Sequence, residues 1–403
     1  MRIAAALLLA VLAAPLPLRA QDDSVEARLR KLEAEVESLQ KENAQLRRDL
    51  GLEVVARQSA IKKAGSAPIQ LGGLIQAQTE GGDRGDSRFT DANARAFLRR
   101  ARLNVSGRFV EEFSFRAELE LAGSLSNATG LRTQLTDGYI NWNRFDIANV
   151  RFGQFKTPFG FQQLYADPRL YTAERSMMSD RLTPGRQIGL QLAGTTVDER
   201  FTYAVGAFNG SGTNQNFNDN DKFMAAARIG AVPFINRVFG QVTKLSIGAN
   251  AFRTTDTNLA LPSDFGVDST PTTPAKDNLF LGRRRAAGVD AQFELGPFEL
   301  WSEYMRGTFE PASRIPLGRF RSDGWYAQAA YTVIPDTLQL VERLEVFDPS
   351  DATAGDATRS LVSGLNWYFK QHDLKLQVDW MHSRVPGVSK EQQKVIARLQ
   401  TVF

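Results

Sequence analysis

The sequence predicts an all-β transmembrane barrel of about sixteen antiparallel strands, preceded by an N-terminal α-helical coiled coil. Three observations predict this class. The chain begins with an export signal, most of it alternates between polar and apolar residues, and it closes on a strand-like segment that ends in Phe403. The alternating segments have the length of membrane strands, because a tilted membrane strand needs about ten residues, whereas strands in soluble sheets usually have about five or six.

Residues 1–20 have the pattern of a Sec-type signal peptide. Arg2 supplies the basic start, an apolar run extends from Ile3 to Ala14, and Ala20 precedes a polar segment. The apolar run is shorter than the ~20 residues that a membrane-spanning helix requires. We therefore expect an exported protein that is cleaved after Ala20.

The heptad pattern of residues 21–50 predicts a coiled-coil helix. Apolar side chains recur at alternating steps of four and three residues, and Asn43 occupies one core position, where a buried amide fixes the register between chains. The apolar core positions are Val25, Leu29, Leu32, Val36, Leu39, Leu46 and Leu50. A seam this narrow indicates self-association rather than a lone surface helix. Residues 51–68 form a linker, and we expect the helix in the periplasm, where both ends of an even-stranded barrel lie.

Residues 69–403 form the predicted barrel domain. In the segment 100–109, Arg100 and Arg102 lie on one face of the strand, while Leu103 and Val105 lie on the other. Aromatic residues near predicted strand ends, such as Trp325, Tyr326 and Trp367, are expected to form the girdles found at both membrane interfaces.

The connections between strands are of two kinds. Tight links such as Gly296-Pro297 alternate with long polar stretches at 82–95, 157–186, 209–221, 254–279, 307–322 and 348–358. Short periplasmic turns and long extracellular loops are the asymmetry expected of an outer-membrane barrel. About sixteen strands enclose a lumen wide enough to hold water.

Composition excludes several classes of chemistry. The chain has no Cys and two His, which argues against a disulfide scaffold, thiolate chemistry and a multi-histidine metal centre. No nucleophile elbow, phosphate-binding loop or metalloprotease motif is present. We therefore expect no enzymatic activity, no catalytic residues, no metal and no cofactor.

Several consecutive motifs resemble the phosphate- and polyphosphate-selective porin family (porin O and P type) of bacterial outer membranes. They are Phe97–Leu103, Asp137–Ile140, Arg151–Gly160, Ala173–Ser176, Pro184–Gly189 and Phe208–Gly210. The resemblance implies a sixteen-stranded trimeric barrel that passes anions through a pore lined with basic residues. This sequence lacks a dense Arg ladder at two-residue spacing, which weakens the implied specificity for phosphate but not the porin assignment.

The distribution of charge locates the candidate pore residues. The net charge of +4 is too small to argue selectivity by itself, and selectivity in pores comes from charges clustered at the narrow point. We expect Arg100 and Arg102 to face the lumen, joined by basic residues of the 157–186 loop folded inward. The candidate pore-lining and anion-binding residues are Arg100, Arg102, Arg108, Arg116, Arg151, Lys156, Arg175 and Arg181.

The sequence thus predicts an outer-membrane porin with an anion-preferring channel, for which phosphate or polyphosphate are candidate solutes. Two alternatives remain open at this stage: a general or cation-preferring porin of the same fold, and an envelope-tethering protein whose barrel is only an anchor. The expected partners are outer-membrane lipid and lipopolysaccharide, small anions, two further copies in a homotrimer, and the cell wall through the coiled coil. We expect no contact with nucleic acid.

Overall fold

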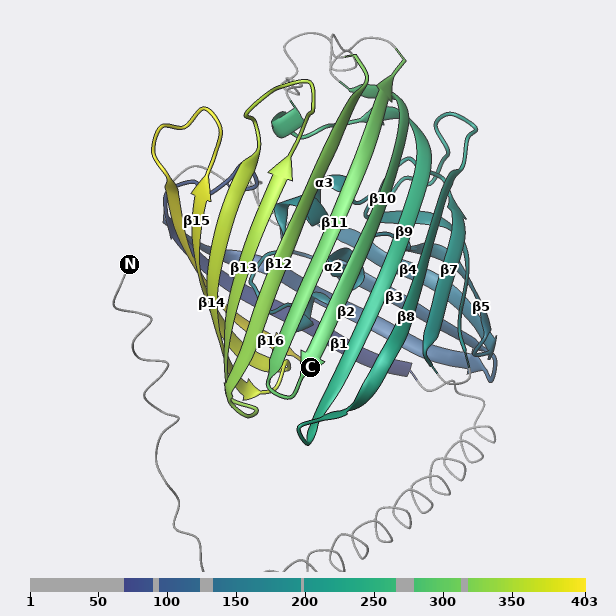
Figure 1. Ribbon diagram of the computed structural model, residues 1–403. Helices are drawn as coiled ribbons and strands as arrows, with labels where there is room; N and C mark the ends of the chain where they lie inside the picture. The colour runs from purple at the N-terminus through teal and green to yellow at the C-terminus, as the bar shows by residue number, and fades with distance from the viewer. Residues whose placement is uncertain (1–68, 90–93, 124–132, 197–198, 266–278, 313–317) are drawn as a thin grey trace, which may run out of the picture. The chain divides into compact units, whose positions relative to one another are not determined.

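Residues 69–403 form a single closed barrel in a computed structural model of the chain, which describes this range except for 90–93, 124–132, 197–198, 266–278 and 313–317 (Figure 1). Sixteen strands follow one another around the wall in sequence order, every neighbouring pair is antiparallel, and β1 pairs with β16 to close the ring. The predicted strand number and topology are confirmed. No helix within the described ranges has the length and hydrophobicity to span a bilayer.

The strands differ widely in length around the barrel. They are β1 (Ile69–Gly82), β2 (Arg95–Val110), β3 (Phe113–Glu120), β4 (Gln134–Phe145), β5 (Ala148–Lys156), β6 (Arg186–Thr195), β7 (Phe201–Phe208), β8 (Met224–Val238), β9 (Gln241–Leu259), β10 (Phe280–Leu295), β11 (Phe298–Pro311), β12 (Phe320–Ile334), β13 (Leu338–Asp348), β14 (Thr358–Lys370), β15 (Leu374–Arg384) and β16 (Gln392–Val402). The shortest, β3 and β7, have 8 residues each and the longest, β9, has 19.

Long and short connections lie at opposite rims, as predicted. Two of the predicted loops, 254–279 and 307–322, are shorter than expected. The first is shortened because β9 continues to Leu259, and the second because β11 continues to Pro311 and β12 begins at Phe320. In β9, the residues after 253 are polar and were therefore predicted to form a loop, but they continue the strand to Leu259. By the asymmetry of outer-membrane barrels, we expect the rim with the short turns to be the periplasmic one.

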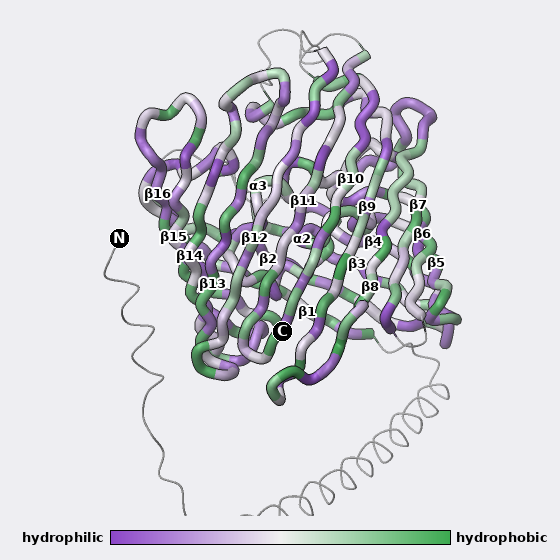
Figure 2. Tube along the Cα trace, viewed as in Figure 1, coloured by the Kyte–Doolittle hydropathy of each residue, from purple (hydrophilic) through white to green (hydrophobic). Residues whose placement is uncertain are grey.

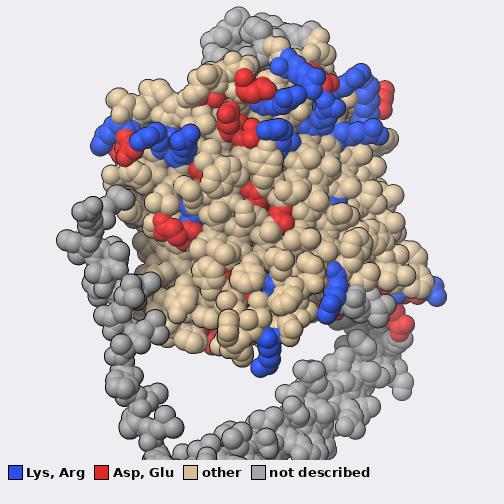
Figure 3. Space-filling model, viewed as in Figure 1, with Lys and Arg blue, Asp and Glu red and all other residues tan. Residues whose placement is uncertain are grey.

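Hydrophilic and hydrophobic residues alternate along the strands (Figure 2). Many large apolar side chains of the wall are exposed, whereas the buried interior holds polar side chains such as Gln76 and Arg398 beside an apolar cluster that includes Trp301. On β12, Trp325 points outward and is 37% exposed, whereas Tyr326 points inward and is fully buried. The expectation that Tyr326 belongs to an aromatic girdle is therefore wrong, because its side chain faces the interior. Lys and Arg side chains on the outer wall gather mostly at the long-loop rim (Figure 3).

The connection between β5 and β6 folds into the barrel. It contains α2 (Phe161–Leu164), the 3₁₀ turn η1 (Asp167–Arg169) and α3 (Met177–Leu182). The loop leaves the wall between β5 and β6, and its backbone is held by strands of the far side: Glu303 on β11 accepts the Phe161 N–H at 2.6 Å, and Asn366 on β14 donates to the Tyr171 carbonyl at 2.8 Å. A segment held by strands across the ring must cross the lumen. We call residues 157–185 the inward loop.

A glycine permits the sharp entry of the inward loop. Gly160 has a φ of 79°, in the left-handed region that favours glycine, and a Cβ placed there would meet Met305 Cε at 2.8 Å. Any other residue would be strained by its backbone angle and would collide with the wall of β11.

The inward loop covers one side of the inner wall and leaves the other side wet. Inward-facing side chains on β14–β16 and β1 are almost completely buried, as at Asn366 and Gln400, both 0% exposed. On the opposite side, the Arg116 side chain of β3 remains 32% exposed and that of Arg228 on β8 remains 17% exposed. The partly exposed stretch of the inner face therefore lies along β2–β8, and we call it the wet wall.

The chain ends next to the start of the barrel. Phe403 and Gly73 exchange two backbone hydrogen bonds, from Gly73 N–H to the Phe403 carbonyl at 2.8 Å and from Phe403 N–H to the Gly73 carbonyl at 3.1 Å. The ends of the barrel domain thus share the rim with the short turns. The signal peptide (1–20), the coiled coil (21–50) and the linker (51–68) lie outside the described residues, so these three remain predictions.

Candidate functional site

A carboxylate of the inward loop sits at the centre of an arginine cluster. Asp167 accepts hydrogen bonds from Arg102 at 2.6 Å and from Arg175 at 2.5 Å, and Arg100 approaches the same carboxylate at 3.3 Å. Arg100 and Arg102 come from β2, and Arg175 comes from the inward loop itself. The structure therefore brings together three of the eight residues singled out in the sequence, and Asp167 holds the position of an anion among them.

A second loop carboxylate, Glu174, is held in the same manner. Arg99 donates to both of its oxygens, at 2.7 and 2.9 Å, and Arg398 on β16 pairs with it from the other side. Two parallel N–H···O bonds from one guanidinium are the strongest and most directional form of ion pair. Sequence alternation alone did not identify Arg99 or Arg398 as lumenal.

Arg99 faces inward because β2 contains a bulge. The register between β1 and β2 shifts where Gln76 pairs with Arg100 and Ala77 pairs with Leu98, which leaves Arg99 as the extra residue. A bulge breaks the two-residue alternation, so two successive side chains can point to one face. Arg99 and Arg100 consequently both enter the lumen.

The two loop carboxylates stay ionised over a wide pH range. Burial favours the neutral form of Asp167, but Arg100, Arg175 and Arg102 outweigh it and hold the pKa of Asp167 well below its usual range. Burial acts on Glu174 in the same direction, and Arg99 and Arg398 likewise hold its pKa below the usual range. Both groups are anions at neutral pH, each matched by guanidinium groups.

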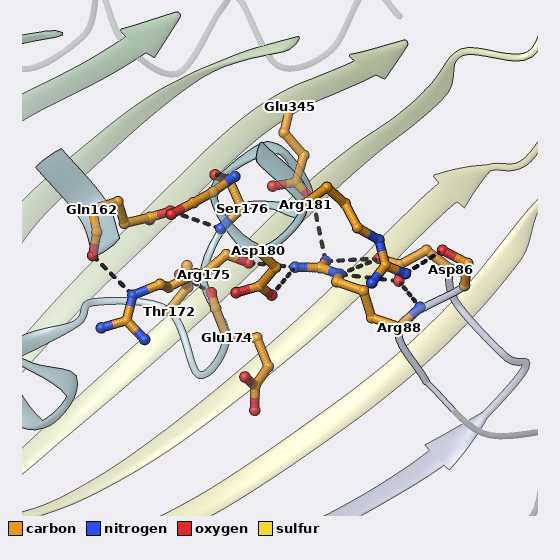
Figure 4. A network of polar contacts seen from close by, with 12 residues as sticks. Asp86, Arg88, Gln162, Thr172, Glu174, Arg175, Ser176, Asp180, Arg181 and Glu345 are labelled. Carbon is orange, nitrogen blue, oxygen red and sulfur yellow. Dashed lines mark hydrogen bonds and ion pairs between the residues drawn. The ribbon is translucent and has the colours of Figure 1, made fainter. Parts of the chain in front are cut away.

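Backbone contacts hold the rest of the inward loop against the wall. Arg343 on β13 donates to the Glu174 carbonyl at 2.9 Å, and Lys375 on β15 donates to the Leu170 carbonyl at 2.7 Å. From the β1–β2 connection, Arg88 donates to the Arg175 carbonyl at 2.5 Å and to Asp180 at 3.2 Å (Figure 4). These contacts fix the loop at several points along its length.

Of the other predicted residues, Lys156 and Arg181 make their contacts with protein groups and fix the inward loop. Lys156 donates to the backbone carbonyls of Gln163 at 2.7 Å and Tyr165 at 3.3 Å. Arg181 on α3 pairs with Asp264 of the β9–β10 connection at 2.6 Å, away from the cluster around Asp167.

Three predicted residues lie on the inner wall of β2–β5, outside the cluster around Asp167. Arg116 pairs with Glu118 at 2.5 Å and keeps a third of its side chain exposed. The Arg151 guanidinium lies 4.4 Å from the ring centroid of Tyr139, and its Nε has no hydrogen-bond partner among the described residues. Arg108 is exposed near the short-turn rim, apart from the others.

Arg186 is a further member of this wall that the sequence analysis did not single out. It donates to Asp137 at 2.8 Å, beside the Glu118 that Arg116 binds. Its position at the first residue of β6, after a long polar stretch, gave no strand parity from which to read its direction. The wet wall therefore carries guanidinium groups interleaved with carboxylates.

This arrangement suits transient binding of anions. A planar guanidinium offers paired donors to carboxylate or phosphate oxygens, and the partly exposed Arg116 guanidinium is one such group. Neighbouring carboxylates keep the wall from becoming a deep anion trap, which conduction requires. Asp167 and Glu174, by contrast, already satisfy the arginines of the covered side.

Comparisons with known proteins agree with this geometry. Residues 69–403 match the sequence profile of the family described as phosphate-selective porin O and P. No curated protein matches the chain in a direct comparison.

Solved structures share the barrel at low sequence identity. The outer-membrane channel DcaP of Acinetobacter baumannii is 14% identical, with a TM-score of 0.55 over 84% of this chain and 98% of that one. An anion-selective porin from Comamonas acidovorans is 12% identical, with a TM-score of 0.55 over 84% and 100%. The trimer form of OmpT from Vibrio cholerae gives the same values, 12%, 0.55, 84% and 100%. At these identities, the likeness concerns the fold.

Proposed function

The chain belongs to the phosphate-selective porin O and P family, and from this premise we propose that it forms an anion-preferring, water-filled channel in the bacterial outer membrane, with phosphate or polyphosphate among its solutes. The proposed pore-lining residues are Arg116, Arg151 and Arg108 on the wet wall. The other five predicted residues hold the inward loop in place through hydrogen bonds and ion pairs; they are Arg100, Arg102, Arg175, Lys156 and Arg181.

One observation carries the anion preference: the inner wall is built to hold carboxylates with guanidinium groups. Arg100, Arg102 and Arg175 already bind Asp167, which stands where a mobile anion would otherwise be held. Arg116 and Arg151 continue this cationic surface into the water-filled side. Selectivity follows from charge lining the path that ions take.

The assembly we propose is a homotrimer that contacts its neighbours through the low side of the barrel. Strands β5, β6 and β7 have only 9, 10 and 8 residues. Their outward side chains include Phe152 at 62% exposure and Leu190 at 50%. A short apolar wall is better covered by protein than by lipid of full thickness. The remaining outer wall contacts membrane lipid, and the 21–50 coiled coil projects into the periplasm, where it can reach the cell wall.

The test is the ion selectivity of a variant that lacks the wet cations. Opposite charges about 4 Å apart in water attract by about 1 kcal/mol, so losing one such arginine lowers local anion occupancy roughly five-fold. In planar bilayers with a KCl gradient, R116A/R151A is expected to show a lower chloride-to-potassium permeability ratio and weaker block of chloride current by phosphate.

The matched control is R306A, which removes an arginine from the outer wall, where it is 54% exposed. This control is expected to conduct as the wild type does. A wild-type channel that prefers potassium, or an R116A/R151A variant with an unchanged reversal potential, would favour a general or cation-preferring porin. A barrel with no measurable conductance would favour the envelope-tethering alternative.

A further inference from the structure

Arginines are concentrated on the outside of the barrel at its long-loop rim. Figure 3 shows Lys and Arg side chains gathered there, over the upper ends of β9–β12. Strand alternation places these arginines outward: on β10, Arg284 points inward to Asp256, while its neighbours Arg283 and Arg285 are exposed. The six outward arginines are Arg253, Arg283, Arg285, Arg306, Arg319 and Arg321.

Strand pairing places these side chains side by side. Arg253 pairs with Arg285, and Arg285 pairs with Thr308, which in turn pairs with Arg321. Directly opposed residues of neighbouring strands share a face about 5 Å apart. Like charges this close repel each other, so the row is stable in the presence of a counter-anion.

The acidic residues in reach only partly neutralise the cluster. Glu310 lies 3.4 Å from Arg285 and 3.7 Å from Arg319, and Asp323 lies 3.7 Å from Arg306. Arg253 and Arg321 make no ion pair within the described part of the chain. Cationic donors therefore remain in excess on this face.

A groove with small side chains adjoins the arginine row. Its volume is ≈ 640 Å³, and its lining includes Ala225, Ala227, Ala251 and Ala287 together with Arg253 and Arg285. Ala227, Ala251 and Ala287 form one continuous row across β8–β10, because Ala251 pairs with both of the others. Alanines in a row leave a shallow apolar channel in a wall where larger side chains would fill it.

Depth in the membrane separates the two parts of this site. Tyr304 and Trp325 form an outward cross-strand pair two residues deeper than Arg306 and Asp323, and paired aromatics mark the interface between hydrocarbon and headgroups. The row of Arg253, Arg285 and Arg321 lies farther out again. The arginines thus stand at headgroup level, and the alanine row, in which Ala287 pairs with Arg306, lies between the outermost arginines and the aromatic pair.

We propose that this face binds a phosphorylated glycolipid of the outer leaflet, lipopolysaccharide, through its headgroup phosphates and one acyl chain. Arg253, Arg285 and Arg321 hold the phosphate oxygens with paired N–H donors, as guanidinium groups do with phosphate. The acyl chain occupies the alanine groove. The proposal rests on the outer-membrane placement in the proposed function, but not on the selectivity of the channel.

The charge of this face argues for lipid over a second copy of the chain. A two-fold contact would place arginines against arginines, because there the same patch meets itself. The low side of the barrel offers apolar residues such as Phe152 and Leu190 rather than acids that match six cations. A multiply phosphorylated headgroup supplies the missing negative charge.

The test measures binding of purified lipopolysaccharide to the detergent-solubilised, folded full-length protein. In the wild type, we expect tight, saturable binding that weakens at least about ten-fold when the lipopolysaccharide is first dephosphorylated. The R253E/R285E/R321E variant should lose binding of intact lipopolysaccharide to the same degree. These side chains lie on the outer surface, and heat-modifiable migration in SDS gels confirms that the variant is folded.

Two further variants distinguish the parts of the proposal. A251F fills the groove without changing charge, and we expect it to weaken binding of lipopolysaccharide while leaving binding of inorganic phosphate unchanged. R116A/R151A is altered only in the lumen and should bind lipopolysaccharide normally. The lipopolysaccharide site is therefore tested independently of the channel's ion selectivity. Conversely, R253E/R285E/R321E should keep the reversal potential of the wild type.

Two outcomes would overturn the proposal. One is lipopolysaccharide affinity that is equal in the wild type and R253E/R285E/R321E. The other is a smaller oligomer in sedimentation of the variant, at unchanged affinity for lipopolysaccharide, which would make the face a contact between copies of the chain.

Discussion

At the scale of single residues, strand parity predicts direction wherever the strand is regular. Parity placed Arg100 and Arg102 in the lumen, and both lie there against Asp167. It could not place Arg99, because a bulge arises from the pairing of two strands and cannot be recognised in the sequence of one strand alone. Nor could it show that Glu174 of the inward loop meets Arg99, since that contact depends on the path of a non-strand segment.

Glu174 gives the sharpest stability prediction. The substitution Glu174→Gln leaves Arg99 and Arg398 buried without their counter-charge, and breaking a buried ion pair in this way costs about 3–5 kcal/mol. The variant should unfold at lower temperature and lower denaturant than the wild type, as followed by heat-modifiable migration. The control is Glu391→Gln, in an exposed pair with Arg384, which should leave the midpoint unchanged. Equal midpoints for E174Q and the wild type would contradict the prediction.

Acid should weaken the contacts that Asp167 makes in the inward loop only at low pH. The pKa of Asp167 lies below its unfolded value of about 3.9, so its charge stabilises the folded state above that pH. This contribution is lost as pH falls through the lower folded pKa. Single-channel conductance should therefore stay constant from pH 7 to about pH 4 and become noisy or larger only below it. D167N should show the altered conductance already at pH 7. A change in the wild type between pH 7 and 5 would assign the switch to another group.

At the scale of elements, the strands were more predictable than the connections. Alternation over 100–109 and the terminal 395–403 pattern identified β2 and β16, since each faces lipid on one side and polar groups on the other. The inward loop was expected to fold inside on charge alone. Its two short helices and its several anchors to β11–β16 depend on contacts distant in sequence, such as Phe161 with Glu303.

The last strand supplies a prediction about assembly. Deleting Phe403 removes the two backbone hydrogen bonds to Gly73 that hold the β1–β16 register at the rim. Insertion into the outer membrane should fall several-fold, measured as the yield of folded, heat-modifiable protein. The control is Phe239→Ala in the β8–β9 turn, where the ring is 95% exposed; it should insert normally. Normal yields from the truncated chain would show that the terminal aromatic residue is dispensable.

At the scale of the whole molecule, the sequence predicted the barrel and its two unlike rims because both follow from local patterning. It could not predict the uneven height of the wall. That difference, from 8 residues in β7 to 19 in β9, arises from where strand pairing stops on each side of the ring. The low side is the face that we expect to be shared in the trimer.

The predicted coiled coil should add to the stability of that trimer. A chain lacking residues 21–64 is expected to form a trimer that dissociates at lower temperature, because the heptad seam no longer joins the three subunits. Oligomer size and heat resistance in mild detergent are the measurements. The substitution Asn43→Leu, which keeps the helix and removes only the core amide, is the matched comparison and should not lower the dissociation temperature. If the truncated chain keeps the wild-type size and heat resistance, the helix is a tether or spacer.

Glu174 also links the two strands that flank β1, since Arg99 belongs to β2 and Arg398 belongs to β16. This geometry constrains the order of events during folding. Zipping β16 onto β1 before the inward loop has entered would carry the Arg398 guanidinium into the interior with no anion to meet it. We therefore expect closure of the ring to wait for the loop, so that a barrel with a misplaced loop stays open at one seam and exposes an unpaired strand edge. A single carboxylate would then act as a checkpoint that couples completion of the wall to correct filling of the pore.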